Sequence, residues 1–278
     1  MSIKQDKSGR RSVQVEVEVP GTPEQVWQAI ATGPGISSWF VSTQVDGRVG
    51  GTFACDFGSG MVSASKITEW QPPRRLVAED ENWLQGGPSV ATEWTVEARA
   101  NGTCLVRVVH SLFASTDKWD NQLESTEQGW PSFFRVLRYY LSHHAGQRSA
   151  TMTAMAMGSG STDSMWTTLL GALGAAAPRA GQKVSLQAPG ATKLAATIER
   201  VELTGHGKGL EMRISEPVPG IVLTGVFECM GMMMANFQAY LYGDRAETVA
   251  NDRERWQAWL AQTFPSQQSV PPTACEQQ

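Results

Sequence analysis

Residues 41–112 alternate apolar and polar side chains, and turn signals interrupt the alternation at short intervals. A period of two is typical of strands that bury one face. The interrupting signals are Asp46-Gly47, Gly50-Gly51, Gly58-Ser59-Gly60, Pro72-Pro73, Gly86-Gly87-Pro88 and Asn101-Gly102. About six strands fit between such turns. Because short links join antiparallel neighbours, the pattern predicts an antiparallel meander.

A strand and a helix precede this meander. The segment Ser12–Pro20 alternates strictly, which predicts a strand with one buried face. Thr22 then supplies an N-cap and Pro23 suits the first helical turn, so a helix is expected to begin there. The residues Gly33–Gly35 are expected to end it.

A long helix is expected after the meander, within residues 119–144. Trp130, Phe133 and Leu137 recur there at steps of three and four, the spacing of one buried helix face. Pro131, with Gly129 as a break before it, is expected to begin the packed part of the helix.

The remaining chain repeats this order on a smaller scale. Residues 147–161 are small and polar, which predicts a linker. A capped helix from Ser161, several strands and an amphipathic helix over Ala250–Phe264 follow. We interpret residues 162–265 as a degenerate second copy of the first unit; an unrelated α+β extension is the alternative. Residues 266–278, rich in Gln, Ser and Pro, are expected to be disordered.

Five motifs occur in a fixed order in the first 141 residues. They are TPEQVWQAIATGPGISSWF (Thr22–Phe40), VGGTFACDF (Val49–Phe57), ITEWQPPRRLVAEDENW (Ile67–Trp83), GTCLVRVVHSLF (Gly102–Phe113) and GWPSFFRVLRYYL (Gly129–Leu141). Together they resemble the activator of Hsp90 ATPase homologue 1-like family of the START/Bet v 1-like, or SRPBCC, superfamily. The resemblance implies an α+β helix-grip fold for residues 1–146. In this fold an antiparallel sheet wraps on a long C-terminal helix, with an apolar cavity between them.

The side chains expected to line that cavity are aromatic or apolar, with one histidine. They are Trp83, Trp94, His110, Trp130, Phe133, Leu137 and Tyr140. Large aromatic surfaces with a polar handle suit an amphipathic ligand, whereas plain core packing is the alternative for each residue.

His110 shares its strand face with Val106 and Val108, a face that we expect to be concave. It would serve there as a hydrogen-bonding group or an acid/base, or else as a satisfied structural histidine.

Carboxylates also lie on or beside the expected strands. They are Glu69, Asp80, Glu81, Glu93 and Glu97. A carboxylate buried in an apolar cavity could act as an acid, because burial disfavours its charged form. Glu93 and Glu97 have the alternation parity opposite to Trp94, so both are expected to face outward.

Several function classes are disfavoured. The net charge is −4 and no basic run is present, which argues against a nucleic-acid partner. Residues 1–10 have no apolar signal core, and glycines and polar residues break the longest weakly polar stretch. We therefore expect no membrane span and a cytoplasmic location. The four histidines and four cysteines lack metal-binding spacings, so no metal or cofactor is expected, and no catalytic residue is assigned.

The function expected from these features is binding of a small hydrophobic or amphipathic molecule in the cavity. A co-chaperone-like protein-binding role is the first alternative, because the resemblance includes the C-terminal domain of the Hsp90 activator. That activator's separate N-terminal domain has no counterpart in the match. The Met-rich run Cys229–Phe237 is expected to pack against the first domain, and a partner surface is the alternative for it. The second alternative is a cyclase- or dehydratase-type enzyme, for which the sequence offers only His110 as an acid/base.

Overall fold

The computed structural model describes residues 3–6, 10–57, 61–81, 87–113, 117–204, 207–229 and 231–265. The chain divides into two compact units, Met1–Ser149 and Ala150–Gln278. Each is described by itself below, as unit 1 and unit 2.

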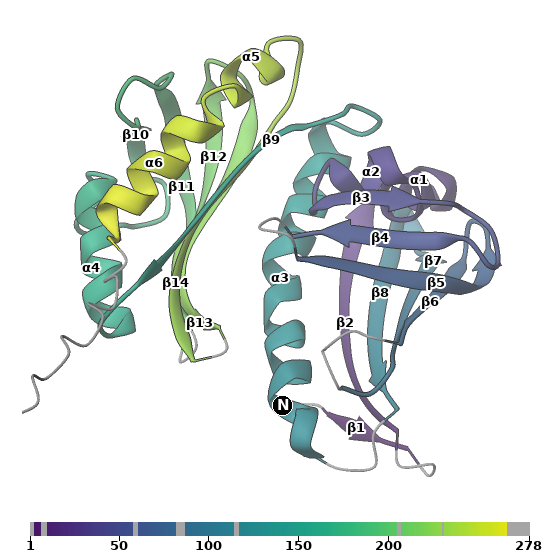
Figure 1. Ribbon diagram of the computed structural model, residues 1–278. Coiled ribbons are helices and arrows are strands. Elements are labelled where there is room, and N and C mark those ends of the chain that lie inside the picture. The colour runs from purple at the N-terminus through teal and green to yellow at the C-terminus, as the bar shows by residue number, and fades with distance from the viewer. Residues whose placement is uncertain are drawn as a thin grey trace, which may run out of the picture. The chain divides into compact units, whose positions relative to one another are not determined.

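Unit 1 is an antiparallel sheet curved around one long helix (Figure 1). Its strands are β1 (Lys4–Gln5), β2 (Arg11–Pro20), β3 (Ser42–Val45), β4 (Thr52–Asp56), β5 (Val62–Gln71), β6 (Arg75–Asp80), β7 (Val90–Ala98) and β8 (Thr103–Leu112). Its helices are α1 (Pro23–Ala31), α2 (Gly33–Ser37) and α3 (Asp120–His143), with single 3₁₀ turns at Ala100–Gly102 and Asp117–Trp119. The spatial order is β1-β2-β8-β7-β6-β5-β4-β3. Strands β3–β8 confirm the predicted six-stranded meander, whereas β1 was not expected.

The start of α1 is fixed by its capping residues. Thr22 Oγ1 accepts a hydrogen bond from the Gln25 backbone N–H at 3.3 Å, and Gln25 Oε1 accepts one from the Thr22 N–H at 3.0 Å. This reciprocal pair satisfies two N–H groups that a helix start leaves unpaired. Helix α1 ends at Ala31, directly before the expected breaker Gly33–Gly35, which itself forms the first part of α2. A Cβ atom on Gly35 would lie 1.9 Å from the Gln28 carbonyl oxygen, so only glycine fits this close turn.

Helix α3 begins at Asp120 and continues through Gly129 and Pro131, so the expected start at Pro131 is wrong. Proline removes one backbone hydrogen bond from a helix. Leu123 before it and Val136 after it are both fully buried, so tertiary packing holds the helix on each side of the weak point.

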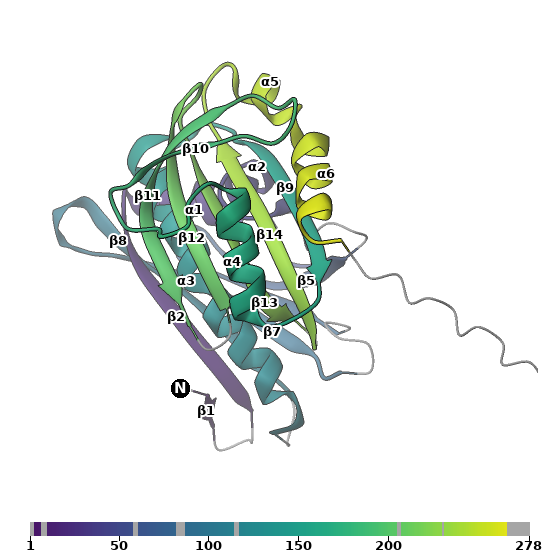
Figure 2. The ribbon, with the colours of Figure 1, turned by 90° about the vertical axis from the view of Figure 1, so that its left-hand side faces the viewer.

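Unit 2 is a second antiparallel sheet with α4 and α6 packed on one face (Figure 2). Its strands are β9 (Ala150–Gly158), β10 (Lys183–Leu186), β11 (Leu194–Leu203), β12 (Gly207–Glu216), β13 (Gly220–Cys229) and β14 (Met232–Leu241). Its helices are α4 (Thr162–Ala172), α5 (Ala246–Ala250) and α6 (Arg253–Thr263). The order is β10-β11-β12-β13-β14-β9.

Most of the predicted linker, residues 147–161, is not a linker, because β9 occupies Ala150–Gly158 and pairs with β14. Its buried residues Met152 and Ala154 alternate with exposed Thr151 and Thr153. Alanine and methionine favour strands only weakly, so this alternation is a weak strand signal in the sequence. The predicted disordered tail, residues 266–278, lies outside the described residues.

The two units share one topology. In each, the first long strand (β2 or β9) pairs with the last (β8 or β14), and the remaining strands follow in reverse order. In each, a helix follows the first long strand and another helix closes the unit. Unit 2 is therefore a smaller copy of the helix-grip design of unit 1. None of the helices in the described part of the chain is long and apolar enough to cross a membrane.

Candidate functional site

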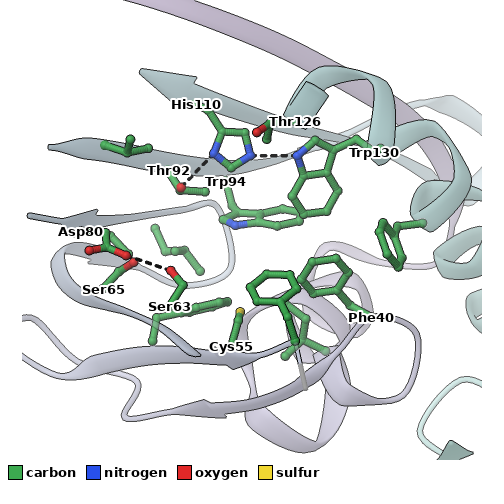
Figure 3. A pocket seen from close by; sticks show the side chains of 18 residues that line it. Phe40, Cys55, Ser63, Ser65, Asp80, Thr92, Trp94, His110, Thr126 and Trp130 are labelled. Atoms are coloured by element: carbon green, nitrogen blue, oxygen red, sulfur yellow. Dashed lines mark hydrogen bonds between the residues drawn. The ribbon is translucent and has the colours of Figure 1, made fainter. Parts of the chain in front are cut away.

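A cavity of about 270 Å³ lies in unit 1 between the sheet and the middle of α3 (Figure 3). Strand alternation determines which side chains of the sheet reach it. From β6 these are Leu76, Ala78 and Asp80, and from β7 they are Val90, Thr92 and Trp94. Successive side chains on a strand point to opposite faces, so the intervening residues lie outside.

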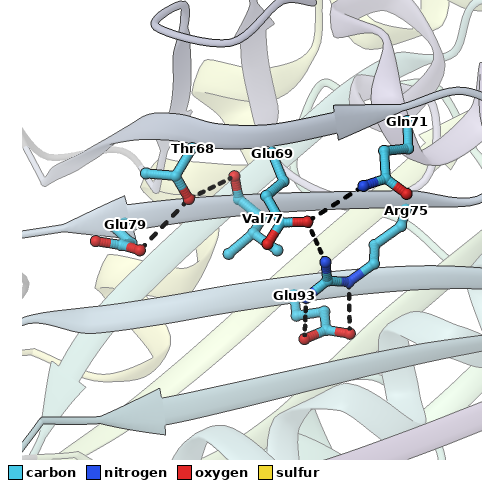
Figure 4. A network of polar contacts seen from close by, with 7 residues as sticks. All are labelled: Thr68, Glu69, Gln71, Arg75, Val77, Glu79 and Glu93. Carbon is cyan, nitrogen blue, oxygen red and sulfur yellow. Dashed lines mark hydrogen bonds and ion pairs between the residues drawn. The ribbon is translucent and has the colours of Figure 1, made fainter.

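The outer face of the same strands carries ion pairs instead (Figure 4). Arg75 donates two hydrogen bonds to the Glu93 carboxylate, both at 3.1 Å, and also pairs with Glu69. Glu97 pairs with Arg99 at 3.1 Å. The prediction that Glu93 and Glu97 face outward is thus confirmed, and neither takes part in the cavity.

The helix wall of the cavity consists of Thr126, Gly129, Trp130 and Phe133. These positions share one helix face by their steps of three and four. A Cβ atom built on Gly129 meets no atom within 4 Å, so this glycine borders open space.

Aromatic rings form the apolar end of the cavity. Phe40, which follows α2, stacks on Trp130 with ring centroids 5.2 Å apart and meets Phe133 edge-on at 4.6 Å. Trp94 meets Trp130 in a T-shaped contact at 5.1 Å. Such offset and edge contacts are favourable for aromatic pairs and leave flat ring faces toward the space between them.

His110 is held by a chain of hydrogen bonds in this wall (Figure 3). The Trp130 indole N–H donates to His110 Nε2 at 2.8 Å. Since Nε2 accepts, Nδ1 carries the proton of the neutral ring and donates to Thr92 Oγ1 at 3.0 Å. Burial lowers the pKa of His110 to about 4, so the ring is neutral at pH 7. Both ring nitrogens make hydrogen bonds within the protein, as expected if His110 is a satisfied structural histidine and not an acid/base.

Polar groups gather at another part of the wall, around Asp80. This residue is only 7% exposed, and its Oδ2 accepts a hydrogen bond from the Ser63 hydroxyl at 2.8 Å. Ser65, two residues further along β5, also lines the cavity beside Asp80 (Figure 3). Cys55 is another lining residue; burial raises the pKa of its thiol, against a smaller opposing effect of its hydrogen bond with Thr43.

The structure brings together four of the seven side chains proposed for the cavity: Trp94, His110, Trp130 and Phe133. Leu137 and Tyr140 are not among the lining residues. They are buried one and two turns further along α3, and the Tyr140 hydroxyl accepts from the Gly146 N–H at 3.0 Å. Trp83 lies outside the described residues.

Sequence reasoning missed several lining residues, among them Phe40, Ser63, Thr92 and the inward position of Asp80. The strand alternation does predict that Asp80 faces inward, because Asp80 shares its strand face with the apolar residues Leu76 and Ala78. The place of Phe40 depends on how α2 turns the chain, for which the sequence carries no periodic signal. Among the described residues, no group of three or more His, Cys, Asp or Glu side chains could hold a metal ion.

Several solved structures are similar to the chain. CalU16 from Micromonospora echinospora is 22% identical, with a TM-score of 0.41, over 51% of this chain and 83% of its own. DynU16, a putative protein in the dynemicin biosynthetic locus, is 16% identical, with a TM-score of 0.41, over 90% of this chain and 96% of its own. The di-domain ARO/CYC protein BexL from the BE-7585A biosynthetic pathway is 12% identical, with a TM-score of 0.44, over 93% of this chain and 100% of its own. These similarities are too low to carry a function over.

No curated protein matches the chain significantly. A family model does match, over residues 20–142, and it is described as activator of Hsp90 ATPase homolog 1-like protein. That range begins at the last residue of β2, takes in the cavity and ends one residue before the end of α3. Residues 20–142 of unit 1 therefore match the activator of Hsp90 ATPase homolog 1-like family.

Proposed function

We propose that unit 1 binds a small, flat and largely apolar molecule without reacting with it. The observation that supports this most is the cavity itself, about 270 Å³ between aromatic walls of Phe40, Trp94 and Trp130. Ligand sites commonly measure roughly 300–1,000 Å³, so this cavity suits a compound of one or two rings.

The walls also suggest the strength of binding. Burying an aromatic ligand against rings gains apolar area, but ordering the ligand offsets much of that gain. A dissociation constant in roughly the micromolar range is therefore expected.

The test uses the full chain and a neutral naphthalene dye whose emission shifts to the blue in apolar surroundings. Ala78→Met would extend a side chain into the cavity and should weaken binding by about tenfold or more, because the dye and the methionine compete for the same space. Ala54→Met is the matched control: Ala54 lies on β4 between Phe53 and Cys55, which line the cavity, and thus on the opposite sheet face. Equal dye binding by both variants would exclude the cavity as the site.

A second candidate is a co-chaperone-like role, favoured by the description of the matched family. The full chain would then raise the ATPase rate of Hsp90. Stimulation that persists in the Ala78→Met variant would separate this role from ligand binding.

The arrangement of ionisable groups supports binding over cyclase- or dehydratase-type catalysis. Asp80 is on β6 and His110 on β8, so β7 lies between them, a separation of about 10 Å by strand spacing. They form no hydrogen-bonded acid/base pair, and both nitrogens of His110 are already engaged.

A further inference from the structure

We infer that Asp80 is the polar anchor of the cavity and that it selects aromatic ligands bearing a positive charge or a hydrogen-bond donor over anionic ones. This inference rests on the proposed function and specifies its ligand class.

The first argument is the charge of the cavity wall. The lining residues include no lysine or arginine within the described part of the chain. His110 is neutral because burial lowers its pKa to about 4, and burial raises the pKa of the Cys55 thiol, which keeps it protonated at pH 7. Asp80 is therefore the one acidic side chain among the described lining residues.

The second argument is hydrogen-bonding capacity. An ionised carboxylate accepts about four hydrogen bonds. The hydrogen bond from Ser63 uses one of these acceptor sites, on Oδ2, and Asp80 makes a further contact within the protein. Because the carboxylate has about four acceptor sites, it can still accept a hydrogen bond from a ligand. Ser63 and Ser65 lie on the same face of β5, so a ligand group at Asp80 would meet hydroxyls rather than hydrocarbon.

The third argument is that His110, the other polar part of the cavity wall, does not compete with Asp80 for a cationic or donating group of the ligand. His110 receives the Trp130 N–H and donates to Thr92, so its ring presents neither a positive charge nor an unengaged acceptor to the cavity. A cationic or donating group would consequently orient toward Asp80, with its ring between Trp94 and Phe40.

The energetic reason is the poor solvation of a carboxylate in such a place. Charge interactions are stronger in a partly dry cavity than in water. Hydrogen bonds to a charged partner contribute more than neutral ones, which corresponds to about tenfold or more in affinity. A ligand carboxylate would meet like charge there and lose affinity by a similar factor.

The experiment measures displacement of the neutral dye from the full chain at pH 7 by matched two-ring compounds: naphthalene, 2-naphthol, 1-naphthylmethylammonium and 1-naphthoate. The ammonium compound should bind about tenfold tighter than naphthalene and the carboxylate about tenfold weaker, with 2-naphthol between naphthalene and the ammonium compound. Asp80→Asn should reduce the spread to within about threefold, because the amide is neutral.

Glu79→Gln is the matched control. Glu79 precedes Asp80 on β6 and faces the outer side of the sheet, where it accepts from Thr68 at 3.4 Å (Figure 4). This variant should keep the full spread.

Equal affinity of the wild-type chain for all four compounds would overturn the inference and leave the proposed function standing. A spread that vanishes in 1 M NaCl would also overturn it, since the selectivity would then come from the net charge of −4 on the surface. Failure of the dye itself to bind would instead remove the proposed function. If Asp80→Asn does not fold, the wild-type series and its salt dependence decide the matter.

Discussion

The two units have the same strand order but differ in what the closing helix meets. In unit 1 the 24-residue helix α3 lies on the larger sheet, and its middle turns border a cavity. In unit 2 the 11-residue helix α6 places Trp256 face to face with Phe237 of β14, with ring centroids 4.0 Å apart. The shared topology therefore does not determine whether space remains between helix and sheet; helix length and the side chains at the contact do.

The two contact tryptophans also differ in their polar atoms. The Trp130 indole N–H donates to His110, whereas the buried Trp256 Nε1 has no hydrogen-bond partner in the described structure. An unpaired buried N–H costs about 1–3 kcal/mol, which close ring packing has to offset. Unit 2 thus uses its tryptophan for packing, and unit 1 uses its tryptophan to build a polar wall.

The largest expected effect is the loss of the filled contact in unit 2. Trp256→Ala should lower the free energy of unfolding by about 3–5 kcal/mol, because a large buried ring leaves a void. Phe133→Ala in unit 1 should lower it by less than about 2 kcal/mol, because one side of Phe133 already faces the cavity. Urea unfolding followed by circular dichroism measures both, and equal losses would contradict the difference between the cores.

Acid should destabilise unit 1 before unit 2. The folded state lowers the pKa of His110 to about 4, so between pH 6.5 and 4 the unfolded chain binds the proton more readily. Stability present above pH 6.5 is lost as pH falls through this window, by about 1–3 kcal/mol. His110→Gln should flatten the dependence in urea unfolding at pH 7 and pH 5; an unchanged slope would mean that another group titrates.

In unit 2 the corresponding acid-sensitive group is Asp252. Burial alone would raise its pKa, but hydrogen bonds from Thr192, whose N–H donates at 2.6 Å, and from Arg255 outweigh burial and lower it. Its contribution is present above its ordinary pKa of 3.8 and is lost only as pH falls below that value. Asp252→Asn should cost about 1–2 kcal/mol at pH 7 in the same assay. A loss already complete at pH 5 in the wild type would contradict this assignment.

The smallest expected effect is a gain. Gly129→Ala should raise stability by about 0.5–1 kcal/mol, because glycine inside a helix is unfavourable and the added Cβ meets no atom within 4 Å. Gly171→Ala in α4 is the matched change in unit 2, also with open space around the Cβ, and should gain less because it lies in the last turn. If Gly129→Ala changes the affinity for the dye and Gly171→Ala does not, the dye binds next to Gly129.

Local patterns in the sequence determined much of this fold. Alternation predicted strands β2–β8, and Thr22 and Gln25 fixed the start of α1. Apolar spacing predicted an amphipathic helix over Ala250–Phe264, where α6 buries Trp256, Trp259 and Leu260. These features depend on neighbours a few residues apart, so periodicity and capping suffice to predict them. The inward face of His110 and the outward face of Glu93 follow from the same alternation.

Tertiary structure decided the rest. Strand β9 is a strand because β14 offers it an edge, and α3 passes through Gly129 and Pro131 because Leu123 and Val136 are buried on either side. The cavity ends at Phe133, before Leu137 and Tyr140, because the last turns of α3 pack directly in the core. Which part of an apolar helix face lines a space, and which part fills one, depends on the distance between helix and sheet. That distance results from contacts between residues far apart in the sequence, which no local pattern records.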